Sequence, residues 1–296
     1  MFFSVIISAY NRADLLPETI SSVLAQTFTN FELIIVDDGS TDQTKEVVGA
    51  IQKNDNRVLY YHKINEERGA ARNFGIRKSS GKFLLFLDSD DLMLPSYLST
   101  LHQTIQENTD IDFLAARFSF IDQNNYIKPH QTALKPGKNE ITAFLRGNYL
   151  ACNFCIRKDK PNFQFFPADR KYATIEDYMF ILANLQFGTS LYFLDEVGVL
   201  MRLHDSRSMG NNQKVIAARE AAVNWIKENV ILTDVQQSAF IAWSAYYCAI
   251  HYYLDYQRSA VFKKLVSAIR LIGLKKEFLI LWIKAILGRH FILLLK

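Results

Sequence analysis

Two hydrophobic patterns alternate along the first hundred residues. Short runs rich in apolar, β-branched and aromatic residues are typical of buried strands, and the segments between them repeat apolar side chains at helical spacing. Strands that are apolar on both faces and separated by helices predict a parallel sheet covered on both sides. The strands are predicted at residues 3–9, 31–37, 57–62 and 82–88, and the helices at about 14–26, 42–53 and 69–79.

Beyond residue 95 the pattern is less regular and then becomes helical, with no strand pattern after about residue 215. We therefore expect an α/β region at residues 1–210 and an all-α region at residues 211–296. The elements predicted between them are a helix at 96–107, a strand near 112–120, a polar loop at 122–138, a strand near 149–157, a helix at about 176–187, two strands in "SLYFLD" and "VGVLMRLH", and a linker or flap at 205–214.

Polar segments follow three of the predicted strands. "SAYNR" ends the first strand, "DDGSTD" the second and "DSDD" the fourth. The carboxyl ends of parallel strands meet at one edge of a sheet, where ligands bind. We therefore expect the three segments to converge on one crevice.

Composition excludes several classes of protein. A chain of 296 residues with 49% hydrophobic content can bury a sizeable core, and a net charge of +4 is too small to indicate a nucleic-acid partner. No stretch of about 18 uncharged apolar residues occurs, so we expect no membrane-spanning helix. The segment "MFFSVIISAYNR" lacks the features of a signal peptide and is predicted to form a strand.

The three cysteines cannot build a disulfide framework, which indicates a reducing compartment. Cys152 and Cys155 form a CxxC pair, but a structural zinc site needs four ligands and only Cys248 remains. Strand alternation would send the two side chains to opposite faces. The pattern favours ordinary buried thiols over a metal or redox site.

The stretch "FLLFLDSDDLMLP" places Asp88, Asp90 and Asp91 at the end of a buried strand. At roughly 4 Å and an effective dielectric constant of about 20, each pair of carboxylates repels by about 4 kcal/mol. A Mg²⁺ or Mn²⁺ ion that bridges the acids to a phosphate would offset this repulsion. The alternative is a solvated acidic turn.

Six segments together resemble the family 2 glycosyltransferases, which are inverting enzymes of the GT-A fold that use nucleotide-diphosphate sugars. The resemblance covers about residues 1–210 and implies a Rossmann-like, mostly parallel sheet flanked by helices. It does not reach the helical C-terminal region. The segments are "SVIISAYNR", "FELIIVDDGSTD", "ERGAARNFGI", "GKFLLFLDSDD", the "ED" of "TIEDYMF", and "MRLHDSRSMG".

The resemblance implies a nucleotide pocket in which Asp37 accepts a hydrogen bond from the uracil imide and Arg72 reaches the base or the diphosphate. Asp88 would contact the ribose or a metal-bound water. Two of these positions have simpler interpretations, since "VDDGSTD" could be a turn capped by Ser40 or Asp42 and Arg72 could be a surface arginine. The nucleotide-binding residues implied are Ala9, Tyr10, Asn11, Arg12, Asp37, Asp38, Arg72, Asp88 and Ser89.

The resemblance also implies a centre for Mn²⁺ or Mg²⁺, with Asp90 as a direct ligand and His204 in contact with the metal or the diphosphate. A lone histidine is as often structural. Arg202 would help to neutralise the leaving diphosphate. Asp91 is expected to point away from the metal and to cap the following turn, and Glu176 to support the donor or acceptor.

Inverting transfer needs one base that removes the proton of the acceptor hydroxyl. The family pattern assigns this role to Asp177, and the product from an α-linked donor would be a β-glycoside. We expect Asp177 and Glu176 to start a helix, whose N-terminus would keep the base charged at neutral pH. Without the other motifs, the pair would be two ordinary acids of a first helical turn.

The C-terminal segment "VFKKLVSAIRLIGLKKEFLILWIKAILGRHFILLLK" combines helical apolar spacing with many cations and one acid, Glu277. This composition fits helices on an anionic membrane surface and equally a bundle that packs on the catalytic domain or on a second subunit. The location implied is cytoplasmic, with peripheral attachment to the inner face of the plasma membrane under the first alternative. The cations are Lys263, Lys264, Arg270, Lys275, Lys276, Lys284, Arg289 and Lys296.

The function implied is metal-dependent transfer of a sugar from a nucleotide-diphosphate donor, a UDP-sugar, to a hydroxyl of a glycan or lipid-linked acceptor. Residues 122–172 are expected to shape the acceptor side. One alternative is a nucleotidyltransferase, although "SVIISAYNR" lacks the glycines of its phosphate-binding loop. A non-catalytic nucleotide-sugar-binding protein is the other.

Overall fold

The computed structural model describes residues 1–204 and 211–288. Its N-terminal half contains four parallel strands, β1 (Phe3–Ala9), β2 (Phe31–Asp37), β3 (Val58–His62) and β4 (Phe83–Asp88). The register aligns Ala9 with Asp37 and Ser8 with Asp88. The polar segments that follow β1, β2 and β4 therefore lie at one edge of the sheet, as the sequence predicted.

The second half of the sheet is mixed. β9 (Cys155–Arg157) runs antiparallel to β4 and to β6 (Phe113–Ile121), whereas β10 (Leu191–Arg202) runs parallel to β6. β5 (Leu92–Met93) lies at the edge, and eight strands of the 10-stranded sheet follow the order β3-β2-β1-β4-β9-β6-β10-β5, with one short strand each added to β6 and β10 off this path. The parallel sheet predicted from the first hundred residues is confirmed for β1 to β4, and β6 and β10 add a further parallel pair, whereas the other pairings are antiparallel.

Three boundaries predicted in this half are wrong. The polar loop at 122–138 contains β7 (Ile127–Pro129) and the start of β8 (Gly137–Asn139), because neighbouring strands supply partners that local polarity does not reveal. Only the last three residues of the strand predicted near 149–157 are extended. The two strands predicted in "SLYFLD" and "VGVLMRLH" are one strand, β10, whose register against β6 shifts at two points between Leu194 and Val199.

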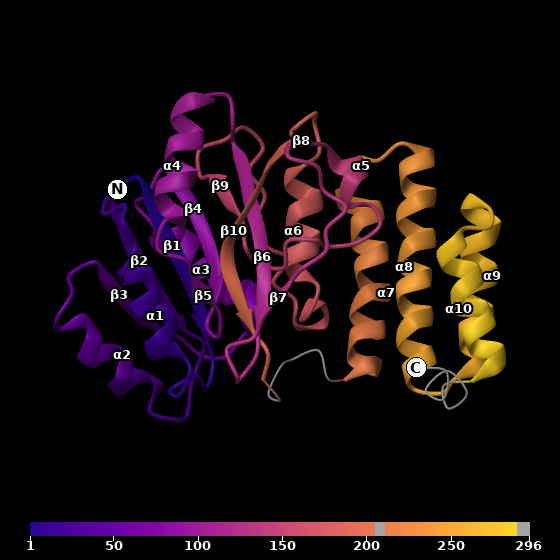
Figure 1. Ribbon diagram of the computed structural model, residues 1–296, viewed down its shortest axis with the longest axis horizontal. Coiled ribbons are helices and arrows are strands. Elements are labelled where there is room, and N and C mark those ends of the chain that lie inside the picture. The colour runs from indigo at the N-terminus through magenta and orange to yellow at the C-terminus, as the bar shows by residue number, and fades with distance from the viewer. Residues whose placement is uncertain (205–210, 289–296) are drawn as a thin grey trace.

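Helices cover both faces of the sheet (Figure 1). Val5, Ile7 and Leu33 face one core, which they share with α1 and α4, while Ile6 and Ile34 face the other, which they share with α3, α6 and α7. The helices are α1 (Leu16–Leu24), α2 (Thr44–Gln52), α3 (Glu67–Lys78), α4 (Tyr97–Glu107), α5 (Ile141–Phe144), α6 (Glu176–Asn184), α7 (Asn212–Asn229), α8 (Asp234–Leu254), α9 (Arg258–Ile272) and α10 (Lys276–Leu287), with a 3₁₀ turn at Arg170–Tyr172.

The thiols of the CxxC pair lie in different cores. Cys152 belongs to the core that contains α6, and Cys155 to the core on the opposite face of the sheet. Both are free and buried, as is Cys248. The interpretation as ordinary buried thiols is confirmed.

Close packing of α3 on the sheet sets the position of the arginine that this helix carries. A β-carbon on Gly75 would lie 2.5 Å from Cγ2 of Ile6, so only glycine allows this approach of helix to strand. Arg72 lies three residues earlier, on the same side of the helix. The approach of α3 to β1 therefore brings Arg72 towards the edge where β4 ends.

The all-α prediction for the C-terminal region is confirmed over residues 211–288, which contain α7 to α10 and no strand. α7 packs into the core that contains α6, through Ala218, Ala222 and Ile226, whereas α8, α9 and α10 surround a third apolar cluster. Figure 1 shows α7, α8 and the pair α9–α10 side by side, in orange to yellow, beyond the sheet. No helix in the described ranges combines the length and apolarity needed to cross a bilayer. The flap predicted at 205–214 falls outside the described residues up to position 210, and its last three residues belong to α7 instead. Arg289 and Lys296 also lie outside the described residues.

Candidate active site

A cavity of about 1010 Å³ opens at the edge where β1, β2 and β4 end. Its wall includes Tyr10, Asp38 and the acids that follow β4. All three polar segments identified in the sequence therefore contribute to one site, as expected. Side chains of α6, α7, α8 and α10 complete the wall.

The three acids after β4 form one cluster. Asp88, Asp90 and Asp91 each offer a carboxylate oxygen that lies within 4.8 Å of those of the other two. The expectation that Asp91 points away from the cluster is wrong. Its Oδ1 accepts a hydrogen bond of 3.2 Å from the backbone N–H of Arg202 on β10, and this contact turns the side chain towards its neighbours.

Basic side chains from distant segments surround the acids. Nη2 of Arg72 lies 2.7 Å from Oδ1 of Asp88. Nε2 of His204 lies 2.9 Å from Oδ2 of Asp90, and Nη2 of Arg12 lies 3.8 Å from the same oxygen. The structure thus brings Arg72 and His204, which the sequence assigned to the metal or the diphosphate, to the acidic cluster, together with Arg12, which the sequence assigned to the nucleotide.

The cluster fits a hard divalent cation. Its donors are carboxylate oxygens on one short loop, which suit Mg²⁺ or Mn²⁺ better than the nitrogen- and sulfur-rich sets that zinc prefers. Asp90 and Asp91 would hold such an ion with Asp88 beside them. A bound cation would also reduce the repulsion among the three acids.

Arg202 lies at the cavity but is largely occupied by the protein. Its guanidinium binds Oε2 of Glu18 at 2.5 Å, the carbonyl oxygen of Leu15 at 2.9 Å and Oγ1 of Thr19 at 2.7 Å, and its Nε donates to the carbonyl oxygen of Asp90. These contacts fasten the acidic loop to α1. Arg202 positions the acidic loop, and few of its donors remain for a diphosphate.

Asp37 is buried at the end of β2 and is not among the residues that line the cavity. Its carboxylate accepts hydrogen bonds from the backbone N–H of Ser40 at 2.8 Å and from the hydroxyl of Tyr60 at 2.6 Å, and Nδ1 of His62 lies 3.3 Å away. Burial favours a raised pKa, but these contacts outweigh it and hold the pKa of Asp37 below its ordinary value. Asp37 therefore supports the loop and does not line the cavity.

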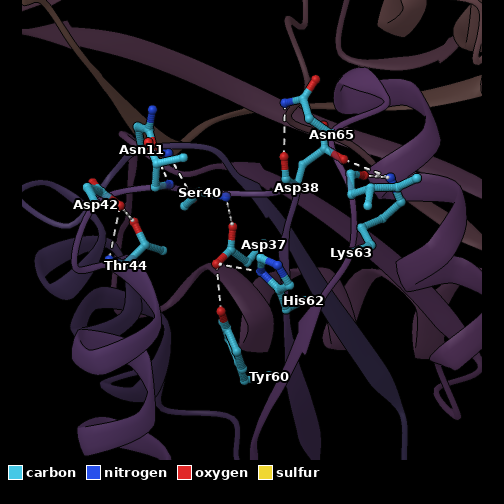
Figure 2. A network of polar contacts seen from close by, with 12 residues as sticks. Asn11, Asp37, Asp38, Ser40, Asp42, Thr44, Tyr60, His62, Lys63 and Asn65 are labelled. Carbon is cyan, nitrogen blue, oxygen red and sulfur yellow. Dashed lines mark hydrogen bonds and ion pairs between the residues drawn. The ribbon is translucent and has the colours of Figure 1, made fainter.

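Asp38, the next residue, does line the cavity. It accepts from Nζ of Lys63 at 2.8 Å and from the backbone N–H of Glu66 at 3.1 Å, while its carbonyl accepts from Asn65 at 2.9 Å (Figure 2). Gly39 follows with a φ of +82°, and a β-carbon there would lie 2.9 Å from the backbone nitrogen of Asn65. The glycine of "VDDGSTD" is required for this turn.

The segment after β1 is divided between site and scaffold. Ala9, Tyr10 and Arg12 line the cavity, and Tyr10 is 49% exposed. Asn11 instead turns to the loop after β2, with a φ of +52° and its Oδ1 accepting from the backbone N–H of Thr41 at 2.8 Å. Asn11 is therefore a scaffold residue, whereas Ser89, which the sequence also assigned to the nucleotide, lines the cavity.

Glu176 and Asp177 start α6, as predicted. Glu176 is buried, with Oε1 2.7 Å from Nη1 of Arg72 and Oε2 accepting from the backbone N–H of Thr174 at 2.9 Å. Thr174 has a φ of +93°, which is strained for a β-branched residue. This turn holds the two acids against the cavity.

Asp177 faces the cavity, and its Oδ2 accepts a hydrogen bond of 2.8 Å from Asn148. Burial, and then the adjacent carboxylate of Glu176, raise the pKa of Asp177 from 3.8 to about 7. The expectation that the helix N-terminus keeps this carboxylate fully charged is wrong, because desolvation exceeds the effect of the helix dipole. A carboxylate with a pKa near 7 suits a general base.

The C-terminal helices contribute to the cavity in a way that sequence reasoning missed. α8 presents Trp243, Tyr246, Tyr247 and Ile250, and α7 presents Arg219. The α8 residues recur at i, i+3, i+4 and i+7, so their common helix face could be read from the sequence. What that face covers could not be read.

Comparisons with known proteins agree with this geometry. Residues 4–168 match the family model of Glycosyl transferase family 2. An uncharacterized glycosyltransferase of Rickettsia conorii is 42% identical over 134 residues, which are 45% of this chain and 22% of that protein. A GalNAc(5)-diNAcBac-PP-undecaprenol β-1,3-glucosyltransferase of Campylobacter jejuni is 42% identical over 106 residues, 35% of this chain and 34% of that protein. The match thus spans about a fifth to a third of the length of these relatives.

A solved structure shares the fold. The crystal structure of Staphylococcus aureus TarS residues 1–349 in complex with UDP-GlcNAc superposes with a TM-score of 0.71 at 22% identity, over 92% of this chain and 82% of that one. Together with the sheet order and the acidic cluster, this likeness identifies a protein of the GT-A fold. The chain belongs to glycosyl transferase family 2.

Proposed function

We propose that this protein is a metal-dependent inverting glycosyltransferase that uses a UDP-sugar. The observation that carries the proposal is that one cavity contains both an acidic cluster suited to a divalent cation and Asp177, a carboxylate with a pKa raised to about 7. A leaving diphosphate and an attacking hydroxyl need these two groups on opposite sides of one sugar.

The donor diphosphate would bind at the acids after β4. A Mn²⁺ or Mg²⁺ ion on Asp90 and Asp91 would supply positive charge for the phosphate oxygens. Arg12, which lies 3.8 Å from Asp90, would contact the same diphosphate, and Asp88 would face the ribose. His204 would orient Asp90 through its 2.9 Å contact.

The nucleoside would lie between the ends of β1 and β2. Asp38, which lines the cavity, is the better partner for the uracil imide than Asp37, whose carboxylate is occupied by Ser40 and Tyr60. Ala9 and Tyr10 would form the wall beside the base, with Ser89 near the ribose. TarS, the structural neighbour, was crystallised with UDP-GlcNAc, which supports a UDP-linked donor.

The transfer step would use Asp177 as the base. The acceptor oxygen forms a bond to the anomeric carbon while the bond from that carbon to the diphosphate oxygen breaks, and the electron pair leaves with the diphosphate. The acceptor proton passes to the carboxylate of Asp177, which Asn148 holds at 2.8 Å. Attack from the face opposite the leaving group inverts the anomeric centre, so an α-linked donor yields a β-glycoside.

The acceptor would be a glycan or a lipid-linked saccharide. The relative from C. jejuni is named for an acceptor linked to undecaprenol through a diphosphate, which supports the lipid-linked class. Such acceptors are reached at a membrane surface. The same proposal therefore places the protein in the cytoplasm, at the inner face of the plasma membrane.

One face of α10 is suited to that surface. Leu279, Ile280, Ile283, Ile286 and Leu287 are each 42–58% exposed and recur at the spacing of one helical stripe, opposite the buried residues of the helix. We name these five residues the α10 stripe. Exposed Lys275, Lys276 and Lys284 lie on the same helix or just before it and would attract anionic headgroups.

The test is a panel of UDP-sugars and other nucleotide sugars with Mn²⁺, scored for release of nucleoside diphosphate. We expect release from a UDP-sugar, loss of release and of metal-dependent donor binding in Asp90→Ala, and loss of turnover with nearly unchanged donor affinity in Asp177→Ala. Full turnover by Asp177→Ala would overturn the role of the base. Donor binding without release or transfer under any condition would instead identify a non-catalytic binding protein.

A further inference from the structure

Six arginines line the cavity, and five of them are paired with acids. Arg12, Arg68, Arg72, Arg146 and Arg202 each form an ion pair with an aspartate or glutamate. Arg219 of α7 is different, because it forms no ion pair with any residue in the described ranges 1–204 and 211–288. Of the arginines at the cavity wall, Arg219 therefore has no acidic partner within the described part of the chain.

Arg219 is also buried. Its side chain is only 6% exposed, and its guanidinium carbon lies 4.7 Å from the ring centre of Tyr178 and 4.3 Å from that of Tyr247. Its Nε is buried and has no hydrogen-bond partner within the described part of the chain. The arginine is thus held at the cavity wall between two tyrosines, with which it also forms side-chain hydrogen bonds, while its Nε donor is unused.

The two rings do not account for the burial of this charge. Removing a guanidinium from water costs more free energy than two cation–π contacts return. A buried cation is normally matched by an anion and by hydrogen bonds to its N–H groups. Since no acid among the described residues pairs with this guanidinium, the partner that fits is an anionic group of a ligand, which would meet Arg219 where it lines the cavity.

The surroundings of Arg219 are those of a saccharide site. Trp243, Tyr246 and Tyr247 lie on one face of α8 and line the same cavity. Flat aromatic faces of this kind pack against the C–H face of a pyranose ring, and their polar edges can bind hydroxyls. Tyr178 follows Asp177 directly in α6, and Tyr247 interacts electrostatically with Asp177, so the aromatic wall lies beside the base.

We propose that α7 and α8 form the acceptor subsite, and that the acceptor carries a carboxylate or phosphate group that pairs with Arg219. The inference rests on the proposed function only in naming the ligand an acceptor. A uronic acid residue and a sugar phosphate both supply the required chemistry. Arg146, which lies 4.1 Å over Trp243 and is paired with Glu277 of α10 at 2.8 Å, holds the far end of this subsite in place.

The experiment is a saturation-transfer NMR titration of the full chain. Mg²⁺ is used in place of the paramagnetic Mn²⁺, and excess UDP fills the donor side. The probes form two matched pairs, p-nitrophenyl β-glucuronide with p-nitrophenyl β-glucoside, and glucose 6-phosphate with glucose. We expect one charged probe to bind at least about tenfold more tightly than its neutral partner, and this preference to fall as salt is added. The pair that shows the preference identifies the class of anion.

Two variants and a control locate the effect. Arg219→Gln should weaken the preferred charged probe about 10- to 100-fold and leave the neutral probe nearly unchanged, whereas Arg219→Lys should keep a preference for the charged probe. Arg270→Gln, which removes an exposed arginine of α9, should change nothing. Equal affinity of both members in both pairs, or a preference that survives in Arg219→Gln, would overturn the proposal. The comparison in the wild-type protein decides the question even if the glutamine variant does not fold.

Failure of this inference differs from failure of the proposed function. UDP binding and UDP-sugar turnover test the donor side and do not depend on which acceptor is charged. Turnover with neutral acceptors alone would refute the anionic acceptor and keep the glycosyltransferase. Binding of charged glycosides that depends on Arg219, without any turnover of nucleotide sugars, would refute the glycosyltransferase and keep the anionic ligand of Arg219.

Discussion

Nη1 of Arg72 lies 2.7 Å from Oε1 of Glu176, and both side chains are only 3% exposed. Nη2 of the same arginine reaches Asp88 at 2.7 Å. One guanidinium therefore connects the acidic loop after β4 with the first turn of α6, which carries Asp177. The metal-type cluster and the base are held at a set separation by this buried bridge.

Removing the bridge should destabilise the protein. Arg72→Ala would leave Glu176 buried without its nearest counter-ion, with only Arg68 at 3.8 Å, and we expect the free energy of unfolding to fall by about 3–5 kcal/mol. Urea denaturation at pH 7.5 measures the change, with Arg270→Ala as the control for loss of an exposed arginine. A loss below about 1 kcal/mol would show that the pair is dispensable for stability.

Transfer should depend on pH through Asp177. Its pKa is raised to about 7, so the carboxylate that accepts the proton is mostly ionised above that pH and mostly protonated below it. We expect kcat/KM for transfer to fall about tenfold for each pH unit below the pKa. Steady-state rates between pH 5.5 and 9 measure this, with the affinity for UDP as a control. Activity that rises on acidification from pH 8 to 6 would exclude Asp177 as the base.

The carboxylate of Asp177 should also lower the free energy of unfolding at neutral pH. The folded protein binds the proton of Asp177 more tightly than the unfolded chain does, because the pKa is raised from 3.8 to about 7. The contribution of this group to the free energy of unfolding is therefore present below about pH 4 and is lost as the pH rises through 7. Asp177→Asn should be more stable than the wild type by about 1–2 kcal/mol at pH 8, with a much smaller difference at pH 5.

Chemical denaturation at the two pH values, without metal, measures this difference. Asp110→Asn is the control, since Asp110 is exposed and pairs with Lys138 at 2.8 Å. Its replacement should bring no gain in stability at either pH. If Asp177→Asn were less stable than the wild type at pH 8, the carboxylate would not be strained by its surroundings.

Metal binding should depend on the acids after β4. Asp90→Asn keeps the size of the side chain and removes the oxygen charge beside His204, so we expect the affinity for Mn²⁺ to fall by at least about tenfold. Calorimetric titration with Mn²⁺ measures the affinity. Asp110→Asn also removes one negative charge, but from a residue that precedes β6 at the other end of the sheet. This control should leave the affinity for Mn²⁺ unchanged. If both variants lost affinity for Mn²⁺ equally, the loss would reflect the change in net charge and not a metal site at Asp90.

Binding to anionic membranes should depend on the α10 stripe. A glutamate in place of Ile283 would put a charge at the centre of the apolar face and repel anionic headgroups, so Ile283→Glu should lose most binding to vesicles that contain phosphatidylglycerol. Co-sedimentation at low salt measures the bound fraction. Val235→Glu is the matched control on α8, where the side chain is 79% exposed. Equal sedimentation of wild type and Ile283→Glu would remove the α10 stripe as the attachment surface.

The sequence alone determined the parallel half of the sheet and the convergence of the three polar segments. Apolar runs such as residues 31–37 and 83–88 are local signals for buried strands, and the edge at which parallel strands end follows from connectivity. The sequence also predicted that "ED" starts a helix and that the C-terminal region is helical. Helix starts and apolar periodicity are properties of neighbouring residues.

Only the tertiary structure decided which side chains face the cavity and what their protonation and pairing are. Asp37 and Asp38 are adjacent and chemically identical, but contacts from Tyr60 and His62 take one into the scaffold and leave the other at the wall. The pKa of Asp177 depends on how much protein surrounds it, which no local pattern encodes. That Arg219 has no acidic partner among the described residues is visible only once α7 and α8 are packed against α6, since charge compensation and solvation are set by residues far apart in the chain.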